Sequence, residues 1–114
     1  MKNRSSPVTS GILVVLCTCP PDQAETLAEL LIERKLAACV NVTPSVRSLY
    51  FWQGRMQRDE EALLIIKSSE AAWPALERTL KEHHPYEVPE IIALPVVRGS
   101  TAYLEWVEEN LCTD

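Results

Sequence analysis

The sequence has few of the residues that commonly build active sites or nucleic-acid surfaces. It contains three glycines and two histidines among 114 residues, and its net charge is −5. Because the glycines stand singly, no glycine-rich phosphate-binding loop is present in the sequence. Lys and Arg are scattered singly, so the basic stripe of a nucleic-acid-binding protein is missing. The same charge disfavours anionic membrane surfaces, and we expect neither nucleic acid nor membrane as a partner.

Cysteine is also sparse, and its spacing excludes two common classes of small protein. The four cysteines form no C-x-x-C pair, which removes the spacing of a zinc ribbon. A disulfide scaffold would carry more cysteines and fewer core residues. No apolar run reaches transmembrane length, and residues 12–17 are too short for the core of a usual signal peptide. We therefore expect reduced thiols and a cytoplasmic location.

The remaining composition is typical of one globular domain. Hydrophobic residues make up 46% of the chain and charged residues 24%, an ordinary balance for a folded protein. The length fits one hydrophobic core and is too short for two ordinary domains. Residues 1–10 are polar and contain Pro7, so we expect a flexible N-terminal arm at 1–10 and a single domain at 11–114.

Hydrophobic periodicity predicts alternating strands and helices. Pro44 favours a bulge or an edge position within the second strand, and Pro95 favours an end or an edge in the fourth. Pro85 ends the second helix near His83. The order β-α-β-β-α-β followed by α predicts an α+β fold of the ferredoxin-like double βαβ type with an extra C-terminal helix. The expected strands lie at 12–17, 39–52, 62–66 and 91–97, and the expected helices lie at 23–35, from about 70 to 83, and from about 100 to 111.

Capping side chains precede two of the expected helices. Asp22 stands three residues before Glu25, which predicts a variant of the N-terminal capping box. Ser68 and Ser69 precede the second helix and could cap it.

The end of the second strand carries more apolar area than a monomer needs. Residues 49–52, Leu-Tyr-Phe-Trp, place large apolar groups on both faces of the strand, just before a turn at Gln53-Gly54. A ferredoxin-like sheet has helices on only one face, so the other face would expose such side chains. Exposed apolar area of that size usually marks an interface, and we expect an oligomer.

Few side chains could bind a metal ion. His83 and His84 are the only histidines, and adjacent side chains on a helix diverge by about 100°. They could converge on one ion only where the helix breaks, which is where Pro85 stands. A thiolate from Cys17 could be a third ligand, and imidazole with thiolate suits copper or zinc. Cys19 shares a strand face with Cys17 and could compete with it.

Other interpretations of these residues remain open. The histidines could form a solvated helix end, where imidazolium suits the helix dipole, and Cys17 could be a small core residue. A nucleophilic enzyme would use Cys17, with His84 as its base and Glu87 or Glu90 as the orienting acid. Nothing in the sequence places these groups together, and we do not expect an enzyme.

Six segments stand in a characteristic order: LAACVNV at 36–42, SLYFWQG at 48–54, IKS at 66–68, HHPYEVPE at 83–90, LPV at 94–96 and YLEW at 103–106. Together they resemble the CutA divalent-cation tolerance family over residues 12–111. The resemblance implies a ferredoxin-like fold and a compact homotrimer similar to the trimers of PII signalling proteins. It also implies binding of copper(II), one ion per subunit, by Cys17, His83 and His84, with a role in tolerance to divalent cations.

A second function is compatible with the same trimer. The protein would then be a PII-like regulatory module that senses a small ligand at subunit clefts. Residues 98–101, Arg-Gly-Ser-Thr, open the last expected helix and could hold an anion on backbone N–H groups. A plain helix cap is the alternative for this segment.

Overall fold

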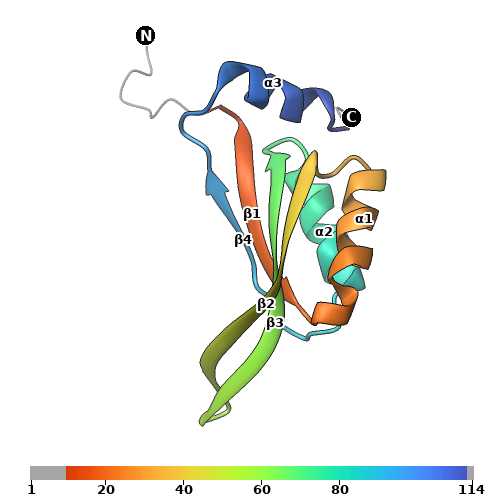
Figure 1. Cartoon of the computed structure of the whole chain (residues 1–114). Coiled ribbons are helices and arrows are strands. Elements are labelled where there is room, and N and C mark those ends of the chain that lie inside the picture. The colour runs from red at the N-terminus through yellow and green to blue at the C-terminus, as the bar shows by residue number, and fades with distance from the viewer. Residues whose placement is uncertain (1–9, 113–114) are drawn as a thin grey trace.

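The computed structural model describes residues 10–112, so the expected N-terminal arm lies outside the described residues except for Ser10. The expected order of strands and helices is confirmed (Figure 1). No helix within the described residues is long and apolar enough to cross a membrane. The elements are β1 (Ile12–Cys19), a short 3-10 turn (Pro21–Gln23), α1 (Ala24–Glu33), β2 (Cys39–Trp52), β3 (Arg55–Ser69), α2 (Trp73–His83), β4 (Ile91–Pro95) and α3 (Thr101–Glu109).

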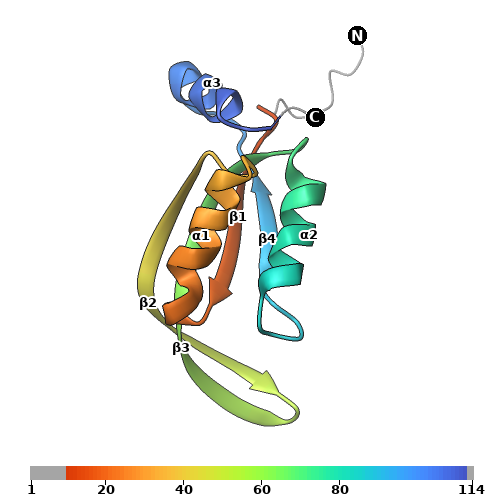
Figure 2. The same ribbon diagram turned by 90° about the vertical axis from the view of Figure 1, so that its right-hand side faces the viewer.

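The four strands form one sheet in the order β2-β3-β1-β4, and every neighbouring pair is antiparallel. The protein is therefore a mixed α+β protein, as the sequence predicts. Helices α1 and α2 lie side by side on one face of the sheet, and α3 lies at one end of it (Figures 1 and 2). The edge position of β4 agrees with Pro95 at its end, since proline cannot donate to a neighbouring strand.

Strands β2 and β3 form a hairpin that is longer than the rest of the sheet. Their register shifts between Thr43 and Val46, which confirms the bulge expected at Pro44. Strand β1 pairs with β3 only as far as Ala62, so residues 46–61 project beyond the sheet as a two-stranded arm (Figure 1). The turn at its tip has positive φ at Gln53 (53°) and Gly54 (78°), as a type I′ hairpin turn requires. We call residues 46–61 the hairpin arm.

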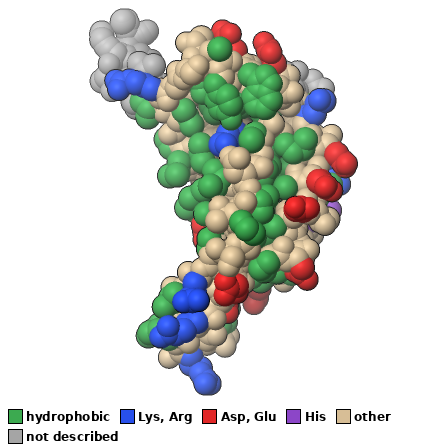
Figure 3. All heavy atoms as spheres, viewed as in Figure 1, with side chains coloured by type: hydrophobic (Ala, Val, Ile, Leu, Met, Phe, Trp, Pro, Cys, Tyr) green, Lys and Arg blue, Asp and Glu red, His purple; other side chains and the backbone are tan. Residues whose placement is uncertain are grey.

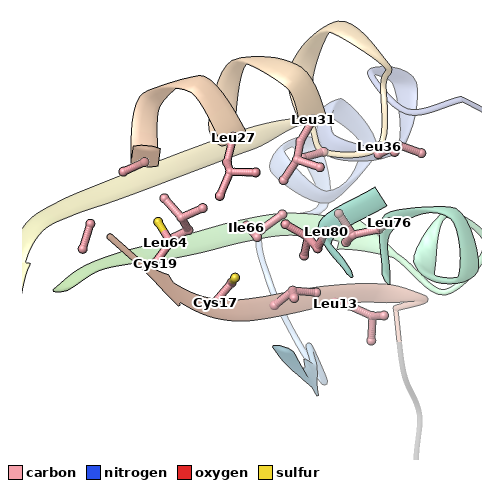
Figure 4. Packing of buried hydrophobic residues seen from close by; sticks show 14 residues of the cluster. Leu13, Cys17, Cys19, Leu27, Leu31, Leu36, Leu64, Ile66, Leu76 and Leu80 are labelled. Atoms are coloured by element: carbon pink, nitrogen blue, oxygen red, sulfur yellow. The ribbon is translucent and has the colours of Figure 1, made fainter. Parts of the chain in front are cut away.

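The hydrophobic core lies between the sheet and helices α1 and α2 (Figure 4). A smaller cluster joins Ile12 to Val107 and Leu111 beneath α3. Within β1, Val14 and Leu16 are only half-buried. No helix covers their face of the sheet. The main core contains Leu13, Val15, Cys17, Cys19, Leu27, Leu31, Leu64, Ile66, Leu76 and Leu80, among others.

The predicted caps are wrong in part. Asp22 lies inside the 3-10 turn, and the residue that precedes α1 is Gln23, with no side-chain capping bond. Ser68 and Ser69 end β3 instead of capping α2 directly. The Ser68 hydroxyl donates to the Leu36 carbonyl at 2.7 Å, and the Ser69 hydroxyl accepts the Ala72 N–H at 3.2 Å. The strand continues further than expected because Ser68 and Ser69 pair with Leu13 and Ile12 of β1.

Candidate functional site

Cys17 lies near the end of β1, and its side chain faces the core. It is 0% exposed and sits with Cys19 among the leucines between sheet and helices (Figure 4). Burial raises the pKa of the Cys17 thiol to about 12, and the charges of Cys19, Glu90 and Glu61 add to the effect. Burial also raises the pKa of Cys19. At neutral pH both groups are thiols, which are poor metal ligands and poor nucleophiles.

His84 connects the end of α2 to the end of β1. Its backbone is extended (φ −90°, ψ 137°), because the ring of Pro85 disfavours helical geometry in the residue before it. The side chain is 8% exposed. Its Nε2 lies 2.7 Å from the Thr18 carbonyl oxygen, and its Nδ1 accepts the Tyr86 N–H at 3.1 Å.

These two contacts define the tautomer of His84. A carbonyl oxygen can only accept a hydrogen bond, so Nε2 must carry the proton, and the lone pair of Nδ1 is already used. Neither nitrogen is free to bind a metal in this arrangement. His84 instead fixes the loop after α2 against β1.

His83 is the last residue of α2, and its side chain is exposed. Its Nδ1 lies 3.0 Å from the Thr79 carbonyl oxygen one turn earlier, so Nδ1 donates and Nε2 carries the lone pair. A histidine that binds a metal commonly donates its other ring N–H to a backbone carbonyl in this way. His83 therefore fits the role of an imidazole ligand.

The three predicted ligands do not form one metal-binding group in this chain. Within residues 10–112, no three or more His, Cys, Asp or Glu side chains are placed to hold a metal ion. The ligand set of Cys17, His83 and His84 stays a prediction. The alternative nucleophile and base are not paired either, because His84 bonds to Thr18 and Tyr86, and Cys17 Sγ contacts the Thr18 carbonyl at 3.7 Å.

A cleft of about 560 Å³ lies between the base of the hairpin arm and the loop that follows His84. We call it the carboxylate cleft. Four acidic side chains supply most of its polar lining, together with Thr18 and Ser48. Three aromatic residues supply most of its apolar lining, together with Leu49 and Val88. The acidic residues are Asp59, Glu61, Glu87 and Glu90, and the aromatic residues are Tyr50, Trp52 and Tyr86.

Tyrosine hydroxyls face these carboxylates. Tyr50 donates a hydrogen bond to Asp59, and this bond is the main reason that the pKa of Tyr50 is raised. The pKa of Tyr86 is raised by burial first and then by the carboxylate of Glu61. Both phenols stay protonated at neutral pH and can donate to the carboxylates.

The sequence reasoning named Glu87 and Glu90 as candidate acids and missed Asp59, Glu61 and Tyr86. The position of Asp59 could have been predicted from the sequence, because the turn at 53–54 pairs Ser48 with Asp59 and places them on one face of the arm. The approach of Tyr86 to that face depends on the tertiary structure.

The model of the family described as CutA1 divalent ion tolerance protein matches residues 13–110. A divalent-cation tolerance protein CutA from Thermus thermophilus is 48% identical over 98 residues, which cover 85% of this chain and 95% of the relative. One from Escherichia coli is 41% identical over 112 residues, covering 97% and 98%. The crystal structure of CutA1 from Oryza sativa has a TM-score of 0.88 and 42% identity, covering 96% of this chain and 100% of the other.

Proposed function

Because the chain belongs to the family of CutA1 divalent ion tolerance proteins, we propose that it acts in tolerance to divalent metal ions and binds copper(II). The match over residues 13–110 carries the first part of this proposal. The sheet and helices superimpose on structures of the same family, which supports it further. Copper is favoured because imidazole nitrogen binds copper(II) more tightly than the other divalent ions of the first transition row.

His83 is the residue that the geometry favours as the copper ligand. Its Nε2 lone pair is on an exposed imidazole whose Nδ1 proton is already held by Thr79. Cys17 and His84 do not fit as they are placed, because binding would require the loss of a thiol proton in the core and the two hydrogen bonds of His84. We therefore do not propose that Cys17, His83 and His84 bind one copper ion together.

Titration with copper(II) under anaerobic conditions tests the assignment, since copper(II) can oxidise thiols. We expect about one ion per chain, and His83→Ala should lower the affinity at least about tenfold. A Cys17→Ser, His84→Ala variant should keep most of the binding. The control is Glu82→Ala, an exposed neighbour on α2. Loss of binding in the double variant equal to that of His83→Ala would favour the three-ligand site, and full binding by His83→Ala would refute our assignment.

We also infer that the protein is a homotrimer of ferredoxin-like subunits. One face of the hairpin arm carries Leu49, Phe51 and Met56, each more than half exposed. On β4, Ile92 and Leu94 are also about half exposed, on the face of the sheet that no helix covers. Figure 3 shows hydrophobic side chains over this side of the molecule and on the arm. Apolar area of this extent favours burial against further copies of the chain.

A PII-like regulatory trimer that senses a small ligand is the second candidate. The carboxylate cleft favours it, because its volume lies in the range of small-molecule sites. The acidic lining of this cleft does not suit an anion, which is the ligand that the sequence suggests for residues 98–101. Native mass spectrometry with copper and with metabolite mixtures would separate the two candidates. Under either candidate we propose that the protein works in the cytoplasm.

A further inference from the structure

The carboxylate cleft has acidic walls without a basic counterpart. No Lys or Arg is among the described residues that line it. Glu61 is the most deeply buried of these acidic residues, with only 5% of its surface exposed. The one salt bridge within residues 10–112 joins Lys81 to Glu77 on α2 and does not involve Glu61. Glu61 therefore has no cationic side chain within 4 Å among the described residues.

A buried carboxylate without a cation is costly, because it leaves water without gaining an opposite charge. Hydrogen bonding from the Tyr86 hydroxyl reduces this cost but adds no positive charge. Asp59, Glu87 and Glu90 line the same cleft and add negative potential to it. A cation that entered the cleft would offset this potential.

Two of the three aromatic residues of the cleft are held by contacts with other residues. Tyr50 is tied to Asp59 through its hydroxyl. Tyr86 is held at its backbone, where its N–H donates to His84 Nδ1, and its ring lies 4.7 Å from the His84 ring, centre to centre. Trp52 stands on the same face of the arm as Tyr50, since both belong to β2 two residues apart. The cleft therefore presents three aromatic rings, two of them fixed by contacts, and aromatic ring faces attract organic cations.

The shape of the site selects against a chelated metal ion. The carboxylates do not converge, because no three acidic, His or Cys side chains within residues 10–112 can hold one ion together. A larger cation with its charge spread over alkyl groups needs no such convergence. It is attracted by ring faces and by carboxylates at a distance, and the cleft volume of about 560 Å³ accommodates a small molecule.

We propose that the carboxylate cleft binds an organic ammonium ion, with Glu61 as its counter-ion and Tyr50, Trp52 and Tyr86 around its alkyl groups. In this assignment His84 is a positioning residue, because it holds the loop that carries Tyr86. The proposal is independent of the copper assignment, which rests on His83 on α2.

The test compares choline with 3,3-dimethyl-1-butanol, its neutral carbon isostere, on the full-length protein by calorimetry and NMR. We expect saturable choline binding that shifts the Trp52 indole signal, and binding of the neutral alcohol at least about tenfold weaker. Glu61→Gln should weaken choline binding at least about tenfold, since it removes the charge and keeps the shape. Glu108→Gln, an exposed carboxylate on α3, is the matched control and should leave binding unchanged.

Because Glu61 is buried, its variant could fold poorly, and circular dichroism would reveal this. The variant Glu87→Gln, Glu90→Gln alters only exposed residues of the cleft and should also weaken choline binding, by about threefold or more. Equal binding of choline and the neutral alcohol would overturn the proposal. So would choline binding that none of these cleft variants weakens, or the absence of choline binding by the parent protein. None of these outcomes bears on copper binding, so the two proposals can fail separately.

Discussion

Replacing Phe51 by Ala is the sharpest test of assembly through the hairpin arm. Phe51 is 69% exposed in the single chain, the largest exposed fraction among the aromatic residues of the arm. It pairs across the strands with Met56, on the face of the arm opposite to Tyr50 and Trp52. The substitution therefore removes apolar area from the proposed interface without touching the carboxylate cleft, which Phe51 does not line.

The size of the effect follows from the exposed area of this side chain. An aromatic residue of about 200 Å² that is 69% exposed leaves roughly 140 Å² to be buried by a neighbouring subunit. At about 25 cal/mol per Å² this burial contributes up to about 3.5 kcal/mol per subunit, or about 10 kcal/mol per trimer. The concentration at which a trimer half-dissociates varies with the square root of its dissociation constant. The substitution should raise that concentration by up to roughly several thousandfold.

Sedimentation velocity over a dilution series measures this change. The parent should remain a trimer at dilutions at which Phe51→Ala sediments as monomer. Ile32→Ala is the control, because Ile32 is an exposed apolar residue on α1, away from the arm. If Phe51→Ala stays a trimer to the same dilution as the parent, the arm does not hold the assembly through this face. A monomeric parent would refute the homotrimer itself.

Two further predictions concern the core. Ser68→Ala should lower the free energy of unfolding in urea by about 1–3 kcal/mol, because it leaves the buried Leu36 carbonyl without its donor. The control Ser45→Ala, at an exposed position, should change it by no more than about 0.5 kcal/mol. Equal changes in the two variants would contradict this reasoning. The pKa of Cys17 is raised from 9.0 to about 12, so its contribution to stability is complete below pH 9 and is lost as pH rises toward 12. Unfolding free energies measured at pH 8–11 should fall with pH less steeply in Cys17→Ala than in the parent, and parallel slopes would show that the thiol ionises as easily in the folded state.

Much of the architecture could be predicted from local residue patterns. The apolar alternation and the prolines at 44, 85 and 95 predict the element order, the bulge and the edge strand, because each depends on the backbone of a few neighbouring residues. The turn at Gln53-Gly54 likewise determines which residues of β2 and β3 face each other. The wrong cap at Asp22 arose where two prolines impose a 3-10 turn that competes with the capping geometry.

The sequence by itself determined which residue types were available to a site, and only the tertiary structure decided how they are used. His83 and His84 are chemically identical neighbours, yet one keeps an exposed lone pair and the other gives both ring nitrogens to the backbone. The difference arises because the chain leaves the helix between them and packs against Thr18, 66 positions earlier. Glu61 and Tyr86 meet in the carboxylate cleft for the same reason, since contacts between distant segments form only when the sheet is assembled.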